Sequence, residues 1–457
     1  MKWFLGVLLL LLAALLLESG LLAYAAYVLV GLLLVSRALA RNWVGQLSVS
    51  RLCRLVGHNN DEITSDGLTA EIGDRVVVRL VVRNNGSMPV PWVLLEDMLP
   101  RHALDPRFPR LKVVKGKRLQ IGMLRGGKET SVRYQVECLQ RGYYQIGPLV
   151  MENGDLFGLH RRFRVDRQRR FLLVYPKTVP LLGYDLTSRR PIGDVRLTHR
   201  LYEDPTRIAG VRPYETGDPL NRVHWRATAR TGALHCKVYE PSCLAGATLV
   251  LDFHTAGYHS RGEPFRSELA VTAAASLANA VFEMGQQIGL VTNARDAVTR
   301  LRAYDESNLA PESRAEAQAA GAMAEASDSI KPLIVATKRG AEQIRRIRET
   351  LALAELTDTL TLADLLRETQ GRLPRDATVI AILPAVSVES AVALGSLRRQ
   401  GFAVTVVLVM LDDNALETAY TRLLSVNLRD VRHLKNETAL PDLCRMSIDR
   451  SAPYQLA

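Results

Sequence analysis

The feature that most constrains this chain is a pair of apolar runs at its N-terminus. Trp3–Leu17 and Leu21–Val35 contain no charged residue, and only the three residues Glu18–Gly20 separate them. Each run is shorter than the roughly 20 residues that a membrane-spanning helix needs, although the second approaches that length if it extends to Ala40. We therefore predict a transmembrane helical hairpin over residues 1–40, with a tight turn between the two runs.

Three other interpretations of the two runs stay open at this point. A cleaved signal peptide conflicts with the apolar stretch that continues past the small residues at Ala23–Ala25. A single tilted span would place Glu18 in hydrocarbon, at a cost of about 2.5–3.5 kcal/mol. A buried helical hairpin of a soluble protein would show apolar runs of the same length.

Basic residues flank the two runs and are absent from the turn between them. Lys2 precedes the first run, and Arg37, Arg41, Arg51 and Arg54 follow the second. Lys and Arg concentrate on the cytoplasmic side of a membrane protein. We therefore predict an inner (plasma) membrane protein in which both ends of the helical hairpin, and the whole soluble body that follows it, lie in the cytoplasm.

Composition narrows the classes of partner and of site. Lys and Arg number 59 against 47 for Asp and Glu, and the net charge of +12 favours anionic partners such as acidic lipid surfaces. Because no nucleic-acid-binding motif accompanies the charge, we predict no nucleic-acid partner. The five cysteines are widely spaced without a CxxC pair, which argues against a disulfide framework and a structural zinc site.

Residues 41–180 have the pattern of short strands. Ser131–Cys138 alternates apolar and polar residues, as expected of a half-buried strand. Arg75–Arg83 is rich in valine and ends in a turn signal at Asn84–Gly86. We predict an antiparallel β-sandwich that binds or spaces, with no catalytic chemistry of its own.

Two motifs within this β-rich region need a specific interpretation. Gly122–Glu129 is close to a phosphate-binding loop, but Glu129 stands where that loop needs Ser or Thr, so we predict a glycine hairpin turn. Arg161–Arg170 contains six arginines in ten residues. It is either a solvated strand pair whose arginine stems cover apolar surface, or a docking patch for anionic lipid or for an acidic partner.

The segment 181–245 carries the densest group of candidate functional residues. Arginine pairs with carboxylates and stacks on aromatic rings, so we expect Asp218 to pair with Arg212 or Arg222, and Trp225 to lie across one of them. No Ser or Cys is paired with a base here, and His224 and His235 have no evident orienting carboxylate, so we predict no catalytic residue. The residues that we assign to an interaction or structural motif are Arg212, Tyr214, Gly217, Asp218, Arg222, Trp225 and Arg230.

Several motifs together resemble the bacterial domain-of-unknown-function fifty-eight family, and the resemblance covers nearly the whole chain. They are Arg141–Tyr144, Ile146–Pro148, Asp155–Leu159, Val174–Pro176 and the block from Gly210 to Arg230. The resemblance implies a membrane-anchored protein that is commonly encoded beside MoxR-type AAA+ ATPases and proteins with von Willebrand A domains. Such systems are thought to act in the assembly or maturation of other complexes, and the family supplies no catalytic residues to carry over.

Residues 246–457 alternate strands with helices, which predicts a doubly wound, mostly parallel sheet. This half resembles a von Willebrand A domain, and the metal-binding versions place Asp-x-Ser-x-Ser after the first strand. Here Asp252 is retained, but His254 and Ala256 replace the two serines. We predict no metal site and no cofactor, and expect Asp252 to cap a loop or helix.

Two further stretches of this half lie outside the expected core. Glu306–Ser329 is rich in Ala, Glu and Ser, so we expect a mobile insert or a marginal helix. Asp412 and Asp413 follow the last strong strand, and we expect them to belong to a solvated turn.

The predicted fold class is a membrane-anchored α+β multidomain protein: helical hairpin, β-sandwich, connecting segment and von Willebrand A-like domain. The predicted function is a non-enzymatic membrane-tethered adaptor or scaffold that docks a MoxR-type AAA+ ATPase. Two alternatives remain open. One is a hydrolase built from Asp218, His224, His235 and Asp252, and the other is a metal-dependent adhesion module with a degraded site.

Overall fold

The computed structural model shows a mixed α/β protein with an apolar N-terminal helix and several sheets, which confirms the prediction at that level. The chain forms two compact units: Met1–Lys177 with Arg295–Ser329 and Arg348–Glu355, and the remainder from Thr178 onward. The expected insert Glu306–Ser329 lies outside the described residues. The structure describes residues 2–56, 68–154, 161–166, 168–182, 203–215, 222–241, 246–258, 262–298, 331–375 and 377–444.

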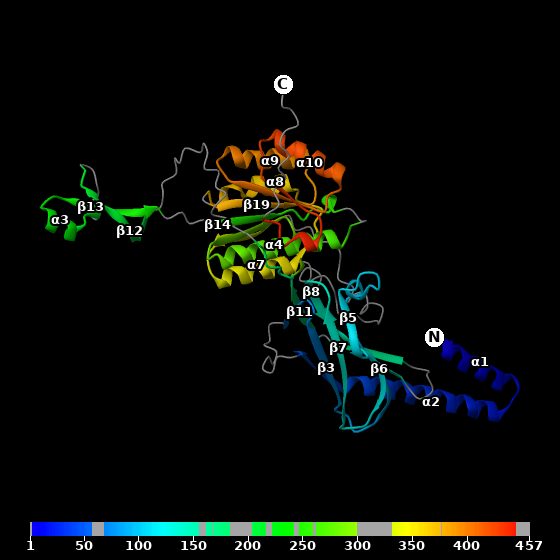
Figure 1. Cartoon of the computed structure of the whole chain (residues 1–457). Helices are drawn as coiled ribbons and strands as arrows, with labels where there is room; N and C mark the ends of the chain where they lie inside the picture. The colour runs from blue at the N-terminus through cyan, green and yellow to red at the C-terminus, as the bar shows by residue number, and fades with distance from the viewer. Residues whose placement is uncertain are drawn as a thin grey trace. The chain divides into compact units, whose positions relative to one another are not determined.

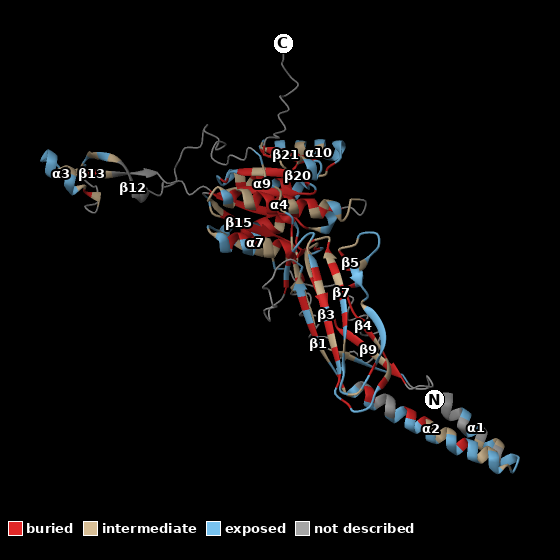
Figure 2. Ribbon diagram, turned by 60° about the horizontal axis from the view of Figure 1, so that its bottom comes forward, coloured by how far each residue is buried: buried red, intermediate tan, exposed pale blue. Residues whose placement is uncertain are grey.

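Two helices begin the chain and lie side by side (Figure 1). Helix α1 covers Lys2–Leu16 and α2 covers Gly20–Gly45, and Glu18 in the turn between them has a φ of 48°. The stretch Gly20–Ala38 of α2 is long and apolar enough to cross a membrane, and most of it is exposed (Figure 2). Helix α1, with 15 residues, is shorter than a full span.

Two four-stranded antiparallel sheets follow and share one hydrophobic core. The first has the order β1-β3-β7-β5, and alternate residues of β3 and β7 are buried (Figure 2). Its strands are β1 (Leu47–Leu55), β3 (Arg75–Asn84), β7 (Glu129–Cys138) and β5 (Leu111–Gly116). The second sheet, in its spatial order, contains β10 (Arg161–Asp166), β9 (Leu149–Gly154), β4 (Val90–Asp97) and β6 (Leu119–Leu124).

Smaller elements complete the first unit. A three-stranded sheet has β11 at its centre, parallel to β2 and antiparallel to β8. The short pair β16-β18 is antiparallel. These elements are β2 (Leu68–Glu71), β8 (Gly142–Ile146), β11 (Arg170–Tyr175), β16 (Arg295–Asp296), β18 (Ala354–Glu355) and the 3₁₀ turn η1 (Arg101–Leu104).

The second unit is built on a six-stranded sheet with the order β17-β15-β14-β19-β20-β21. Five strands are parallel, and the edge strand β17 runs antiparallel to β15. The sequence did not predict that reversal. The strands are β14 (Gly246–Leu251), β15 (Gln287–Thr292), β17 (Leu333–Lys338), β19 (Ala377–Leu383), β20 (Val404–Val409) and β21 (Val431–Leu434).

Helices cover both faces of this sheet, with α4 and α7 on one face and α8, α9 and α10 on the other (Figure 1). The alanine-rich α4 buries eleven residues against the strands. Helix α10 begins at Asp413 with Asp412 at its N-cap, so our expectation of a solvated turn there was wrong. The helices are α4 (Phe265–Glu283), α7 (Ala341–Leu353), α8 (Leu362–Thr369), α9 (Val388–Arg399) and α10 (Asp413–Ser425), with 3₁₀ turns η3 (Thr255–Gly257), η4 (Gln370–Arg372) and η5 (Glu437–Ala439).

A separate antiparallel pair of strands precedes the sheet along the chain. Strand β12 covers Glu203–Pro213 and β13 covers His235–Pro241, and the short helix α3 (Trp225–Thr231) lies in the connection between them. This segment contains the described part of the block that the sequence singled out.

Candidate functional site

The β12–β13 pair brings the two ends of the candidate block together. Arg212 is opposite Cys236, and Pro213 is opposite His235. Beyond the last strand pair, the Tyr214 amide donates to the Leu234 carbonyl at 2.9 Å. The start of α3 is tied to the same hairpin, because the His224 amide donates to the His235 carbonyl at 2.8 Å.

The two histidines of the block have backbone partners. The Nδ1 atom of His224 accepts from the Ala227 amide at 3.0 Å and caps the N-terminus of α3. The Nδ1 atom of His235 lies 2.8 Å from the Ala233 carbonyl. Gly232, with a φ of 74°, ends the helix in the left-handed conformation. Both imidazoles thus help to shape the connection between the two strands.

The structure places five of the seven predicted motif residues. Arg212 donates from Nη1 to the Pro213 carbonyl at 3.1 Å, and its ion-pair partner is Glu215 at 3.7 Å. Tyr214 and Arg222 are half-buried, and Arg230 is exposed. Gly217 and Asp218 lie outside the described residues, so the expected pairing of Asp218 with an arginine stays a prediction.

Helix α3 presents its side chains to solvent. None of its seven residues, all of which the structure describes, is buried. Trp225 is 68% exposed, and its expected position across Arg212 or Arg222 stays a prediction. Arg226 and Arg230 are exposed on the same short helix. Tryptophan and arginine are the residue types enriched at binding hot spots.

The carboxyl edge of the six-stranded sheet is the other place where a ligand would be expected. Asp252 follows β14, and its Oδ1 atom accepts from Asn293 Nδ2 at 2.9 Å and from the His254 amide at 3.2 Å. Burial raises the pKa of Asp252, while the bonds from Asn293 and His254 oppose that shift. Asn293 also donates to the Leu360 carbonyl at 2.9 Å, so the carboxylate belongs to an internal network.

A guanidinium group occupies the middle of this edge. Arg266 in the first turn of α4 donates from Nε to the Val409 carbonyl at 3.1 Å and from Nη1 to the Gly257 carbonyl at 3.2 Å. Its Nη2 atom donates to the Pro384 carbonyl. The Arg266 guanidinium therefore donates to carbonyls at or beyond the C-terminal ends of β14, β19 and β20. Among the described residues, no three His, Cys, Asp or Glu side chains gather as a metal site would require.

Sequence reasoning identified Asp252 as a capping residue but missed Asn293 and Arg266. A signal existed for both. Asn293 is a polar residue directly after an apolar strand, and Arg266 is a basic residue in the first turn of the next helix, where the helix dipole disfavours positive charge. A cation at that position needs another reason to be there, and the three carbonyl acceptors supply it.

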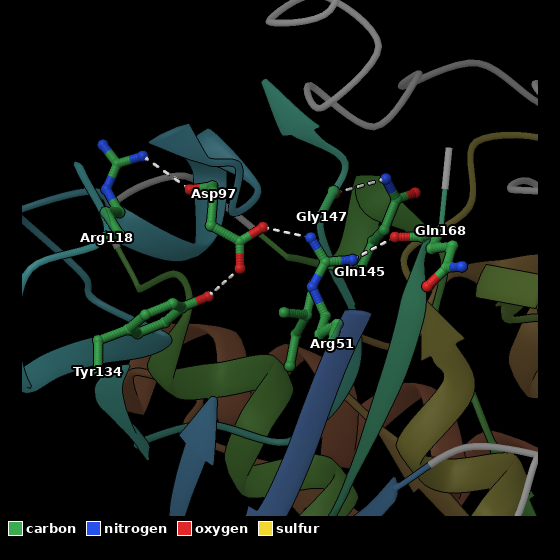
Figure 3. Close-up of polar contacts among 8 residues, drawn as sticks. Arg51, Asp97, Arg118, Tyr134, Gln145, Gly147 and Gln168 are labelled. Carbon is green, nitrogen blue, oxygen red and sulfur yellow. Dashed lines mark hydrogen bonds and ion pairs between the residues drawn. The ribbon is translucent and has the colours of Figure 1, made fainter. Parts of the chain in front are cut away.

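The first unit contains a buried polar network around Arg51 and Asp97 (Figure 3). The two side chains are fully buried, with Nη2 of Arg51 at 2.5 Å from Oδ1 of Asp97. Tyr134 donates its hydroxyl to Oδ2 of Asp97 at 2.6 Å, and Arg51 also donates to the carbonyls of Ile146 and Gln168. Burial raises the pKa of Asp97 and of Tyr134. Solvent does not reach these side chains, so the network is internal to the fold.

Two glycines of the family-like motifs make room for buried side chains. A Cβ atom on Gly147 would lie 2.3 Å from Nη1 of Arg51. A Cβ atom on Gly142 would lie 2.9 Å from the Tyr144 ring, and Tyr144 donates its hydroxyl back to the Arg141 carbonyl at 2.9 Å. The Arg-Gly-x-Tyr and Ile-Gly-Pro motifs are thus explained by packing.

Known proteins match part of this chain. Residues 210–308 match the family model "Protein of unknown function DUF58". That match begins at the candidate block and continues through β14, Asp252 and Arg266. "Uncharacterized protein YeaD" of Bacillus subtilis (strain 168) is 24% identical over 221 residues. Those residues make up 48% of this chain and 52% of YeaD, so the chain spans about half the length of that curated relative.

Similarity to solved structures is distant. Proximal thread matrix protein 1 from the mussel byssus has a TM-score of 0.29 at 10% identity, over 44% of this chain and 46% of that one. The ASH/PapD-like domain of human CEP192 has a TM-score of 0.17 at 15% identity, over 28% of this chain and 83% of that domain. Neither score is high enough to assign a fold.

Proposed function

We propose that this protein is a non-enzymatic, membrane-tethered adaptor that docks a cytoplasmic AAA+ ATPase of the MoxR type. In this proposal α1 and α2 form a transmembrane hairpin in the inner membrane, and the paired sheets act as a β-sandwich spacer. The second unit is a von Willebrand A-like module. The adaptor would serve the assembly or maturation of other protein complexes.

The single observation that carries the docking role is the exposure of α3. A seven-residue helix without a buried residue does not contribute to a hydrophobic core, yet it is capped at both ends and fixed to the β12–β13 pair. Trp225 exposes 68% of its surface on that fixed support. A rigid, exposed tryptophan provides a large contact area at a low cost in conformational entropy, which suits a docking residue.

The carboxyl edge of the second unit supports a binding module over the two alternatives. The spatial order of the sheet is the doubly wound one, with its reversal between β14 and β19. At that reversal Asp252 accepts two internal hydrogen bonds, and Arg266 takes three carbonyls. Both side chains are engaged in internal hydrogen bonds, which favours neither a hydrolase that uses Asp252 nor a metal-dependent adhesion module.

The docking role predicts that Trp225→Ala weakens binding to the purified ATPase. Loss of a central tryptophan commonly costs about 2 kcal/mol or more, so we expect the dissociation constant to rise about thirtyfold. Because the side chain is largely exposed, the variant should fold normally. Binding is measured by biolayer interferometry with the full chain in nanodiscs and the MoxR-type ATPase of the same organism in solution.

Phe265→Ala is the matched control, since Phe265 is 63% exposed in the same unit but lies outside the candidate block. Its dissociation constant should stay within about twofold of that of the unaltered chain. Equal affinity for the Trp225→Ala and unaltered chains would remove α3 from the interface. Absence of ATPase binding by the unaltered chain would contradict the proposed partner.

A further inference from the structure

The glycine turn that resembles a phosphate-binding loop lies at the end of the first unit where α2 joins the sheets. It connects β6 to β7 over residues 125–128. The Gly127 amide donates to the carbonyls of Asn84 and Gly86 at 3.1 and 3.0 Å, which ties this turn to the loop between β3 and β4. The Asn85 amide in turn donates to the carbonyl of Gln46, the residue after α2, at 3.0 Å.

Close contacts make this end of the unit rigid. A Cβ atom on Gly126 would lie 2.1 Å from the Ser87 carbonyl oxygen, so the two loops touch backbone to backbone. Arg164 of β10 donates from Nη1 to the carbonyls of Gly45 and Leu47, at 2.9 and 3.0 Å, and thereby fixes the joint between α2 and β1. Hydrogen bonds therefore connect this end of the unit to the C-terminus of α2.

The distance along α2 places this end close to a membrane surface. The apolar stretch ends at Ala38, and the helix continues for seven residues to Gly45. Seven residues of helix rise about 10 Å, and the headgroup layer is about 5–8 Å deep on each side of the hydrocarbon. Long basic side chains on the loops beside Gln46 can therefore reach lipid headgroups.

The exposed charge on this end is predominantly positive. Arg125 and Lys128 are exposed on the glycine turn, and Arg161 and Arg162 are exposed at the start of β10. Arg161 lies 3.7 Å from Glu152, and 69% of its side chain remains exposed. Strand β10 lies beside α2. The nearby Glu129 is directly opposite Arg83 across the β3–β7 pair, so those two charges offset each other.

The described arginines of the run Arg161–Arg170 lie in different places. Arg164 is engaged at the joint, and β10 carries the chain about 20 Å away from this end before Arg169 and Arg170 are reached. Among the described arginines of the run, Arg161 and Arg162 lie at the same end as the glycine turn.

We propose that Arg125, Lys128, Arg161 and Arg162 bind the headgroups of anionic phospholipids and hold the first unit against the membrane surface. This inference rests on the proposed membrane anchoring by α2. Like a phosphate-binding loop, the turn holds basic side chains on a tight glycine turn. In this proposal the bound phosphate is that of a lipid headgroup. Such binding needs no magnesium ligand at the position of Glu129.

The test measures quenching of a fluorophore on the protein by a nitroxide on the lipid headgroup, with the full chain in vesicles. The chain carries Cys243→Ser so that this cysteine is not labelled; the other four cysteines are buried. A fluorophore is attached at Ser87→Cys, next to the glycine turn, or at Arg107→Cys in the η1–β5 connection as the distal control. Vesicles are made of phosphatidylcholine alone or with phosphatidylglycerol. We expect quenching at position 87 with phosphatidylglycerol, reduced by about half or more in its absence or in high salt, and little quenching at position 107.

Charge reversal identifies the residues. Arg125→Glu with Lys128→Glu should lower the quenching at position 87 about as much as removing phosphatidylglycerol does. The matched control, Lys112→Glu with Lys115→Glu on β5, should leave it unchanged. Quenching that is equal in both vesicle types, or that survives the turn variant, would overturn the inference.

A fluorophore at Tyr27→Cys, within the apolar stretch of α2, separates this inference from the anchoring on which it rests. A nitroxide on the lipid acyl chain should quench it in both vesicle types. Quenching at position 27 without quenching at position 87 would reject headgroup binding and leave the anchor in place. Absence of quenching at both positions would reject the anchor itself.

Discussion

At the scale of single residues, the most informative group is the buried pair Arg51 and Asp97. Its desolvation is costly, and the pair is tolerated because each charge finds its partner within the protein. The sequence offered little sign of it, since Arg51 is one of several basic residues after the apolar runs and Asp97 is an isolated acid at the end of a strand. Which charges pair inside a core depends on strands far apart along the chain.

Removing one member of this pair should be much worse than removing a supporting hydrogen bond. Asp97→Ala leaves the Arg51 guanidinium buried without its carboxylate, and we expect a loss of about 3–5 kcal/mol in the free energy of unfolding. Tyr134→Phe removes one hydrogen bond to Asp97, at a cost of about 2 kcal/mol. Urea unfolding of the full chain in detergent measures both.

All these variants are made in a chain that also carries Trp225→Phe, and unfolding is followed by tryptophan fluorescence. The other three tryptophans lie in residues 1–177, so the fluorescence then reports on the first unit alone. Arg51→Met with Asp97→Leu is the control that removes both charges, and it should cost less than Asp97→Ala. A smaller loss for Asp97→Ala than for the double variant would show that the buried charge is not what makes the site sensitive.

At the scale of helices and strands, sequence periodicity predicted the alternation of elements but not the direction of the strand at the sheet edge. The strands β15 and β19 and the helix α9 lie within residues 246–457, where the sequence predicted alternating strands and helices. These elements are central or strongly patterned, so their residues alone determine them. The antiparallel direction of β17 was not predictable, because local pattern carries no information about strand direction.

His433 on the edge strand β21 predicts that the free energy of unfolding depends on pH. His433 on β21 accepts at Nε2 from the Leu411 amide at 3.3 Å, which ties the edge strand to the turn before α10. Burial, with Lys435 nearby, lowers the pKa of His433. The unfolded chain therefore binds the proton more readily than the folded one. Stability is fully present above pH about 6.5 and is lost as the pH falls toward the folded pKa.

His433→Gln should flatten this dependence, since a glutamine oxygen can accept the same hydrogen bond without titrating. We expect the difference in unfolding free energy between the two chains to change by at most about 1.4 kcal/mol per pH unit below pH 6.5. Urea unfolding followed by circular dichroism from pH 5 to pH 8 measures that difference. A constant difference over this range would show that His433 titrates equally in both states.

At the scale of the whole molecule, the order of the parts along the chain was predictable, and the exposure of α3 was not. Apolar run length and alternation predicted helices first, strands next and alternating strands and helices last. The exposed α3 could not be predicted, because exposure depends on what the rest of the chain leaves uncovered. The composition of the block around Trp225 led us to assign it an interaction role, and that role stays a prediction.

The proposed topology predicts where a protease can act. In right-side-out membrane vesicles trypsin should leave the body after α2 intact, because the basic residues that follow Gly20–Ala38 favour the cytoplasmic side. In inverted vesicles the same treatment should digest it. Immunoblotting for the C-terminal region checks both, with a periplasmic-facing protein as the control for vesicle orientation. Digestion in the right-side-out vesicles would reverse the topology.

The arginine at the carboxyl edge of the second unit bears on how such a protein could respond to its surroundings. The positive charge there is part of the polypeptide, joined to α4 by a covalent side chain. It does not dissociate, and no chelator can remove it. Changes in ionic composition that would load or empty an exchangeable metal site leave this charge in place.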